Sequence, residues 1–186
     1  MVYDIKLSDV VRRLILECGG VPLMEKSGHT FIKRMMIKEN GLLGCEVSGH
    51  YFFRELQGGD DGLFTAVLVA NMLGHAGSLK SLRSALPPIY ATPDLRLPAR
   101  VLSFEAIKGR LREHLTPTTE WTIDGLRIET SDGFILVRKS VTEPVVTMRI
   151  EGVNKGGLSH LIERTLSAFP EFATEIRTQA AQVDDL

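Results

Sequence analysis

Three polar side chains that suit a ligand rich in hydroxyl groups are crowded into residues 44–50, Gly-Cys-Glu-Val-Ser-Gly-His. Glu46 can accept hydrogen bonds, Ser48 can donate and accept, and His50 can do either according to its tautomer. An apolar run precedes the stretch and Tyr-Phe-Phe follows it, which predicts a loop between two strands. The loop is therefore a candidate sugar-binding site. A solvated surface hairpin is the alternative, because polar hairpin loops are common.

A second candidate site spans residues 138–144, Arg-Lys-Ser-Val-Thr-Glu-Pro. Arginine binds phosphate in a bidentate manner, hydroxyls donate to it, and the backbone N–H groups of a tight loop can complete an anion-binding nest. The residues expected to supply these groups are Arg138, Lys139, Ser140, Val141 and Thr142. A hairpin with exposed charges is the alternative, and no P-loop, GxGxxG or HExxH pattern occurs in the chain.

A third polar stretch, Lys-Ser-Gly-His at residues 26–29, precedes a predicted helix. A lysine beside a helix N-terminus attracts anions, and His29 could move a proton near neutral pH. A structural role for this lone histidine is the alternative.

The elements that must position these residues follow from the apolar pattern. In the first half of the chain, strands are predicted at residues 2–6, 21–24, 41–43 and 51–53, and helices at 9–18, 30–38 and 63–73. Residues 58–62 are predicted to be a flexible loop in which Asp60 or Asp61 caps the following helix. Strand and helix alternate, which predicts an α/β layer whose first strands are largely parallel.

The second half of the chain has a different pattern. Prolines at 87, 88, 93 and 98 interrupt regular structure, so residues 85–92 are the predicted boundary between domains 1–88 and 89–186. Strands are predicted at 94–97, 121–123, 126–129, 134–137 and 144–151, with helices at 103–114 and 158–169 and a polar helix or frayed end after residue 170. This half is predicted to be α+β, an antiparallel sheet with helices on one face.

Composition limits the classes of function. The 186 residues are 44% hydrophobic and carry a net charge of −1, so the chain is globular and has no general attraction for nucleic acid or an anionic membrane. Two cysteines without metal-ligand spacing predict neither a disulfide framework nor a metal site, and they fit a reducing cytoplasm. No apolar stretch is long enough to span a bilayer.

These motifs occur in one order along the chain: Lys-Ser-Gly-His at 26–29, the stretch at 44–50, Asp-Asp-Gly at 60–62 and the stretch at 138–144. As a set they resemble the α-D-phosphohexomutases, in particular the bacterial phosphomannomutase/phosphoglucomutase branch, over nearly the whole chain. The resemblance implies that residues 1–88 form that family's third domain, a three-layer α/β/α domain that is incomplete at its N-terminus. Residues 89–186 would form its fourth domain, which has a TATA-box-binding-protein-like fold.

The resemblance also implies an activity. Family members are isomerases that interconvert hexose 6-phosphate and hexose 1-phosphate through a bisphosphorylated sugar. By resemblance the sugar is bound by Lys6, His29, Glu46, Val47, Ser48, Gly49 and His50, with His29 as a possible acid or base. The phosphate that is not transferred would be bound by the stretch at 138–142. Glu46→Ala is expected to remove most activity of the complete enzyme while the fold is unchanged.

Two motifs of the family are not found in this chain: the serine that carries the phosphate and the Asp-x-Asp-x-Asp-Arg magnesium loop. The chain alone is therefore expected to be inactive and without a cofactor, with Mg²⁺ bound in a full-length enzyme. The expected partners are glucose and mannose 1- and 6-phosphates and possibly the missing N-terminal half. Without its first helix one sheet face should be partly bare, which predicts self-association. A stand-alone phosphosugar-binding module and an inactive remnant are the alternatives, and the choice between mannose and glucose stays open.

Overall fold

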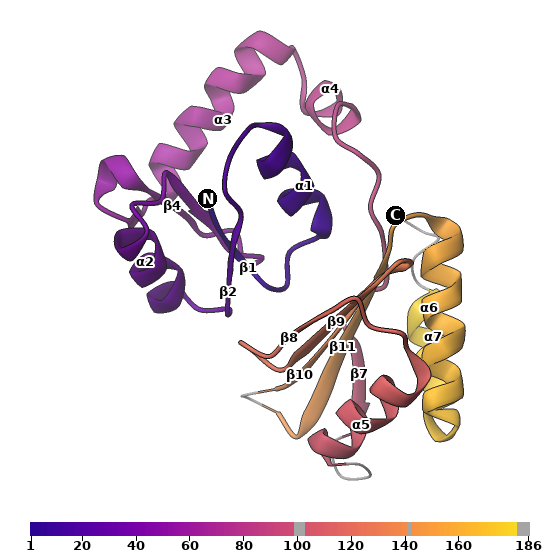
Figure 1. The fold of residues 1–186 in the computed structure, drawn as a ribbon. Coiled ribbons are helices and arrows are strands. Elements are labelled where there is room, and N and C mark those ends of the chain that lie inside the picture. The colour runs from indigo at the N-terminus through magenta and orange to yellow at the C-terminus, as the bar shows by residue number, and fades with distance from the viewer. Residues whose placement is uncertain (99–102, 141–142, 182–186) are drawn as a thin grey trace. The chain divides into compact units, whose positions relative to one another are not determined.

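The computed structural model describes residues 1–98, 103–140 and 143–181 and divides into two compact units, Met1–Pro88 and Ile89–Leu186 (Figure 1). Each unit has its own sheet, and each is described by itself. No helix in these ranges is long and apolar enough to cross a membrane.

The first unit is built on a five-stranded sheet in the order β2-β1-β3-β4-β5. Its strands are β1 (Val2–Asp4), β2 (Leu23–Glu25), β3 (Leu43–Cys45), β4 (Tyr51–Phe53) and β5 (Gly59–Asp60). β1 pairs in parallel with both β2 and β3, which confirms the predicted parallel start of the sheet. β4 and β5 then add antiparallel strands at one edge.

Helices α1 (Asp9–Glu17) and α2 (His29–Lys38) cover opposite faces of this sheet. Ser8 caps α1 by accepting a hydrogen bond from Val10 N at 3.1 Å. Beneath α1 lie Tyr3, Ile15 and Cys45; beneath α2 lie Val2, Ile32, Met36 and Phe52. The predicted three-layer α/β/α arrangement is therefore confirmed.

The predicted flexible loop at 58–62 is wrong in part. Gly59 and Asp60 pair with Phe53 and Phe52 and form β5, because the short helical turn η1 (Arg54–Leu56) brings the chain back beside β4. Asp61 caps α3 (Gly62–Ala76), accepting from Phe64 N at 2.8 Å, and α4 (Leu79–Ser84) follows.

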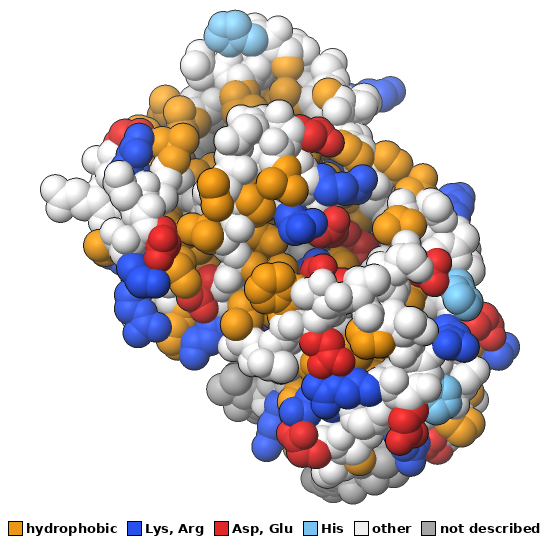
Figure 2. All heavy atoms as spheres, in the orientation of Figure 1, with side chains coloured by type: hydrophobic (Ala, Val, Ile, Leu, Met, Phe, Trp, Pro, Cys, Tyr) orange, Lys and Arg blue, Asp and Glu red, His pale blue; other side chains and the backbone are white. Residues whose placement is uncertain are grey.

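Much of the exposed apolar surface of this unit lies on α3, whereas most strand residues are covered, so the bare sheet face predicted from the sequence is not found in the described residues 1–88. Strand residues on both faces are buried, among them Val2, Tyr3 and Phe52. Exposed apolar side chains on α3 are Leu63, Val67, Leu68, Val69 and Met72. Other exposed apolar side chains of the unit include Leu16, Val21, Ile37, Leu42 and Leu56. In Figure 2, hydrophobic side chains are visible on the surface around this helix.

The second unit is an antiparallel sheet in the order β6-β11-β10-β9-β8, with β7 paired to β11. The strands are β6 (Tyr90–Ala91), β7 (Leu95–Pro98), β8 (Thr119–Trp121), β9 (Leu126–Thr130), β10 (Gly133–Lys139) and β11 (Val145–Gly152). Helices α5 (Phe104–His114) and α6 (Lys155–Ala168) lie on one face (Figure 1). The predicted α+β class is confirmed, although β8 begins two residues before its expected position.

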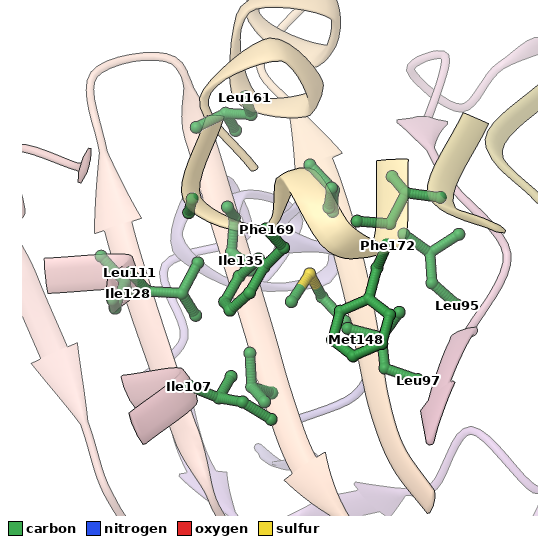
Figure 3. Packing of buried hydrophobic residues seen from close by; sticks show 14 of the residues in the cluster. Leu95, Leu97, Ile107, Leu111, Ile128, Ile135, Met148, Leu161, Phe169 and Phe172 are labelled. Carbon is green, nitrogen blue, oxygen red and sulfur yellow. The ribbon is translucent and has the colours of Figure 1, made fainter. Parts of the chain in front are cut away.

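The core of the second unit includes the segment after residue 170, which was expected to be polar or frayed. Here η2 (Pro170–Phe172) and α7 (Ala173–Ala180) carry buried Phe172 and Ile176. Figure 3 shows Phe169 and Phe172 directed at the sheet, over Ile135 and Met148. Phe169, Phe172 and Ile176 recur at the three- and four-residue spacing of one helix face, and they complete the core.

Candidate functional site

One edge of the first sheet gathers most of the sugar-binding residues predicted from the sequence. The carboxyl ends of the parallel strands β1, β2 and β3 meet at this edge, where open α/β sheets bind their ligands. β5 is antiparallel to β4, and β4 to β3, so β5 also ends there. We call Asp4, His29, Glu46, His50 and Asp60 the sheet-edge cluster.

Asp4 is the buried centre of this edge, with 1% of its surface exposed. Its Oδ1 accepts hydrogen bonds from Lys6 N at 2.9 Å and from Ser27 Oγ at 2.7 Å, and its Oδ2 accepts one from Val47 N at 3.3 Å. Asp4 therefore ties the segments that follow β1, β2 and β3 to one another. It also places the backbone of Lys6, a predicted sugar-binding residue, beside the loop that contains Glu46.

Glu46 is buried and holds the start of α2. Its Oε1 accepts a hydrogen bond from Gly28 N at 2.7 Å, and Gly28 is the N-cap of α2 with no capping side chain of its own. A carboxylate at a helix N-terminus is favourable because the helix dipole is positive there. One of the two oxygens of Glu46 is thus committed to positioning α2 and the His29 that begins it.

Residues 46–50 form the predicted loop between two strands. Glu46 N donates to His50 O at 3.0 Å and Gly49 N donates to Glu46 O at 3.1 Å, which closes a tight turn. Gly49 has a φ of 86°, a conformation that favours glycine. Val47, Ser48, Gly49 and His50 are exposed on the surface of the turn, and Glu46 is buried beneath them.

His29 and His50 share the carboxylate of Asp60. His50 Nδ1 lies 2.6 Å from Asp60 Oδ2, and His29 Nε2 lies 3.4 Å from the same oxygen. The two rings are edge-on with their centroids 6.0 Å apart, and His29 also packs edge-on against Phe52 at 4.8 Å. An acidic group and two imidazoles therefore converge beside the Glu46 turn.

Lys26 lies beside the first turn of α2. Its Nζ lies 3.6 Å from the centroid of the Phe31 ring, in a cation–π contact on the side of α2. The lysine therefore adds positive charge near the start of α2 through a position fixed by an aromatic ring.

The predicted phosphate-binding residues lie in the second unit, at the end of β10. Arg138 Nη2 forms an ion pair with Asp124 Oδ2 at 2.6 Å, and Arg138 Nε is buried without a hydrogen-bond partner. Lys139 is exposed, and Ser140 Oγ accepts from Glu143 N at 3.2 Å. Val141 and Thr142 lie outside the described residues. The arginine is thus already held by a carboxylate in this structure.

Two residues of the sheet-edge cluster were missed from the sequence. Asp4 was treated only as a polar position in a half-buried strand, and Asp60 only as a helix cap. An aspartate at the carboxyl end of a parallel strand was an available signal for Asp4. The sequence contains no comparable signal for Asp60. Asp60 and Asp61 stand between two glycines, and so short a stretch has almost no strand pattern.

The described ranges 1–98, 103–140 and 143–181 contain no group of three or more His, Cys, Asp or Glu side chains arranged to hold a metal ion. Mg²⁺ therefore has no matching ligand set in these ranges.

Comparison with known protein families matches both units. The sequence pattern described as "Phosphoglucomutase/phosphomannomutase, alpha/beta/alpha domain III" matches residues 1–90, and "Phosphoglucomutase/phosphomannomutase, C-terminal domain" matches residues 91–167.

Individual relatives agree with this match. A phosphoglucomutase of Neisseria gonorrhoeae is 34% identical over 169 residues, covering 88% of this chain and 37% of its own length. A phosphomannomutase/phosphoglucomutase of Pseudomonas syringae is 32% identical, covering 87% of this chain and 36% of its own length. This chain therefore spans little more than a third of the length of these relatives.

Solved structures give the same result. A phosphoglucomutase/phosphomannomutase family protein of Burkholderia thailandensis has a TM-score of 0.77 at 34% identity, over 91% of this chain and 37% of its own. An Aspergillus fumigatus N-acetylphosphoglucosamine mutase in complex with GlcNAc-6P and magnesium has a TM-score of 0.59 over 90% of this chain and 40% of its own. At 13% identity, the second similarity concerns the fold alone.

Proposed function

This chain belongs to the phosphoglucomutase/phosphomannomutase family, and from that membership we propose that it is the substrate-binding part of a hexose-phosphate mutase. In this proposal the Glu46 turn and the two imidazoles bind sugar hydroxyls. The end of β10 binds a phosphate through Arg138, Lys139 and Ser140, together with Val141 and Thr142. The complete enzyme would interconvert hexose 6-phosphate and hexose 1-phosphate.

The observation that carries this proposal is the convergence of Glu46, His29 and His50 at the carboxyl edge of the first sheet. Carboxylate, imidazole and exposed hydroxyl groups complement the donors and acceptors of a sugar ring. Ser48 adds a hydroxyl on the same turn. Glu46 and His50 are held by hydrogen bonds to Gly28 N and to Asp60, so a ligand would meet positioned partners rather than mobile ones.

Calorimetric titration with α-D-glucose 1-phosphate tests the proposal directly. Glu46→Gln keeps an oxygen that can accept from Gly28 N but removes the charge and one acceptor, so we expect weaker binding with α2 still in place. Glu163→Gln, on the exposed side of α6, is the matched control and should bind as the wild type does. Equal affinity in Glu46→Gln and the wild type would remove Glu46 from the sugar site.

The phosphate role is tested with the same ligand. Arg138→Ala should weaken binding of glucose 1-phosphate because it removes the bidentate donor at the end of β10. Arg112→Ala removes a guanidinium from a similar ion pair, with Glu120 at 2.7 Å, and serves as the control. An unchanged affinity in Arg138→Ala would contradict the phosphate assignment.

Glucose and mannose phosphates are the proposed ligands, since the Neisseria and Pseudomonas relatives are named as phosphoglucomutase and phosphomannomutase/phosphoglucomutase. We propose that the phosphate-carrying serine and the Mg²⁺ site come from an N-terminal half with which this part works, in the reducing cytoplasm. Binding of glucose 1-phosphate without any such partner would favour the stand-alone phosphosugar-binding module. No binding of any hexose phosphate would leave an inactive remnant.

A second proposed interaction is self-association through α3. The fifteen residues of α3 include no Asp, Glu, Lys or Arg, and most of its apolar side chains are exposed. A helix that is apolar on all sides is normally buried. A second copy of this chain would offer the same apolar surface for mutual burial.

A further inference from the structure

Asp60 is the residue of the sheet-edge cluster whose contacts specify how the imidazoles are oriented. Its Oδ2 lies 2.6 Å from His50 Nδ1 and 3.4 Å from His29 Nε2, so one oxygen faces both rings. The two histidines meet it through different ring nitrogens. The nitrogens that remain on the far side of each ring are therefore Nε2 of His50 and Nδ1 of His29.

The backbone holds Asp60 firmly on both sides. Asp60 is paired with Phe52 in the β4–β5 ladder, and the next residue, Asp61, is fixed as the N-cap of α3 by its 2.8 Å hydrogen bond from Phe64 N. The Asp60 side chain is only 20% exposed, whereas those of His29 and His50 are 51% and 49% exposed. The carboxylate is thus the fixed member of the group, and the imidazoles are the members that a ligand can reach.

The chemistry of the carboxylate determines the tautomer of His50. An ionised carboxylate only accepts hydrogen bonds, so at 2.6 Å the shared proton belongs to His50 Nδ1. Nε2 of a neutral His50 then carries a lone pair and accepts. His29 Nε2 lies farther from the same oxygen, at 3.4 Å, and the Phe52 ring at 4.8 Å limits how the imidazole can turn.

We propose that Asp60 is a positioning residue: it holds His50 as the Nδ1–H tautomer and keeps His29 turned with Nε2 toward it. In this arrangement His50 Nε2 is presented as a hydrogen-bond acceptor for a sugar hydroxyl. The ligand part of this inference rests on the proposed function, whereas the tautomer part stands on the structure of this chain alone. A carboxylate that orients a histidine through its other nitrogen is a general way of fixing imidazole chemistry.

Long-range ¹H–¹⁵N spectra of the imidazoles test the inference in the intact chain near neutral pH, because they report which ring nitrogen carries the proton. In the wild type, His50 should be the Nδ1–H tautomer. Asp60→Ala should reverse this, so that the proton moves predominantly to Nε2. Asp60→Asn, whose side-chain oxygen still accepts, should retain Nδ1–H.

His160 provides an internal control in the second unit. Its Nδ1 lies 2.7 Å from Asp132 Oδ2, the same kind of contact, so it should remain Nδ1–H in the wild type and in both Asp60 variants. If wild-type His50 carries its proton on Nε2, the inference is overturned, whatever the variants do. An unchanged His50 tautomer in a folded Asp60→Ala chain would also overturn it.

Failure of the proposed function would look different. A wild-type chain that binds no hexose phosphate but shows His50 as Nδ1–H, reversed in Asp60→Ala, supports Asp60 as the positioning residue and removes only the sugar ligand. If the chain does bind glucose 1-phosphate, Asp60→Ala should bind it more weakly than Asp60→Asn does, because only the latter presents the same nitrogen to the hydroxyl. Equal affinities would overturn the link between the tautomer and the ligand.

Discussion

Glu46 has two roles at the scale of single residues, and they conflict in the simplest experiment. It is the proposed acceptor for sugar hydroxyls, and it is also the partner of Gly28 N at the start of α2. The expectation that Glu46→Ala would leave the fold unchanged overlooked the second role. A loss of binding in the alanine variant would therefore mix two effects, which Glu46→Gln separates.

Glu46→Ala should lower the free energy of unfolding by about 1–3 kcal/mol, because the partly buried N–H of Gly28 loses its charged acceptor. Glu46→Gln should lose less, since its amide oxygen can still accept. Urea denaturation followed by circular dichroism measures both values. Equal stability of the alanine variant and the wild type would mean that the Gly28 contact contributes nothing to α2.

Cys45 allows a prediction about pH. Burial, with a smaller contribution from Asp4, raises the pKa of its thiol to about 12 from an ordinary value near 9. Because the thiol has a higher pKa in the folded than in the unfolded chain, its contribution to the free energy of unfolding is fully present below about pH 9. That contribution is lost as the pH rises toward 12. Cys45→Ala should therefore lose less stability than the wild type over that interval.

Thiol labelling checks the same residue independently. At pH 8 the native chain should react at exposed Cys18 alone, and Cys45 should react only after unfolding. Rapid modification of Cys45 in the native chain would contradict its burial.

Residue types predicted part of the site. Glu46, His29 and His50 were identified because their types and spacing suit a sugar, and the structure brings them to one edge. Asp60 was not identified as a site residue, because its position depends on the two-residue strand β5, which exists only through pairing with β4. Phe52 and Asp60 are only eight residues apart, but their pairing depends on the η1 turn between them, which no apolar period in the sequence indicates.

At the scale of elements, glycines allow the turns of the second unit. Asp-Gly pairs stand at 124–125 and 132–133, and the second lies in the turn between the antiparallel strands β9 and β10. Gly133 has a φ of 141°, and a Cβ there would collide with the backbone oxygen of Glu151 on β11.

Gly133→Ala should therefore destabilise the chain by about 2 kcal/mol or more, because both the backbone conformation and the space exclude a side chain. Gly109→Ala is the control: this glycine lies within α5 with nothing near its Cβ position, so the change should stabilise by about 0.5–1 kcal/mol. Thermal unfolding of both variants gives the comparison. Similar effects of the two substitutions would show that the turn tolerates a side chain.

The sequence predicted the long helices and strands better than the two-residue strands and the last helix. The amphipathic helices and the long strands of the second unit follow from periodicity, as β10 and β11 illustrate. β5 and β6 have two residues each, too few for any period. α7 was expected to be polar or frayed because Ile176 is the one large apolar residue in its sequence, Ala-Thr-Glu-Ile-Arg-Thr-Gln-Ala.

At the scale of the whole molecule, α3 should make the chain associate with itself. Sedimentation velocity should show dimers or larger species whose proportion rises with concentration. Val67→Lys with Met72→Lys places charges on exposed positions of α3 and should yield a monomer without loss of fold. A wild-type chain that stays monomeric at high concentration, without binding apolar dyes, would contradict this.

The most direct measurement of the central proposal is titration of the ¹⁵N-labelled chain with α-D-glucose 1-phosphate, with inorganic phosphate as the comparison ligand. The sugar phosphate should shift the amide signals of residues 26–29, 46–50 and 60, at the carboxyl edge of the first sheet. Inorganic phosphate should leave 46–50 unmoved, because it has no sugar hydroxyls. Absence of shifts at 46–50 with saturating glucose 1-phosphate would contradict a sugar-binding site at this edge.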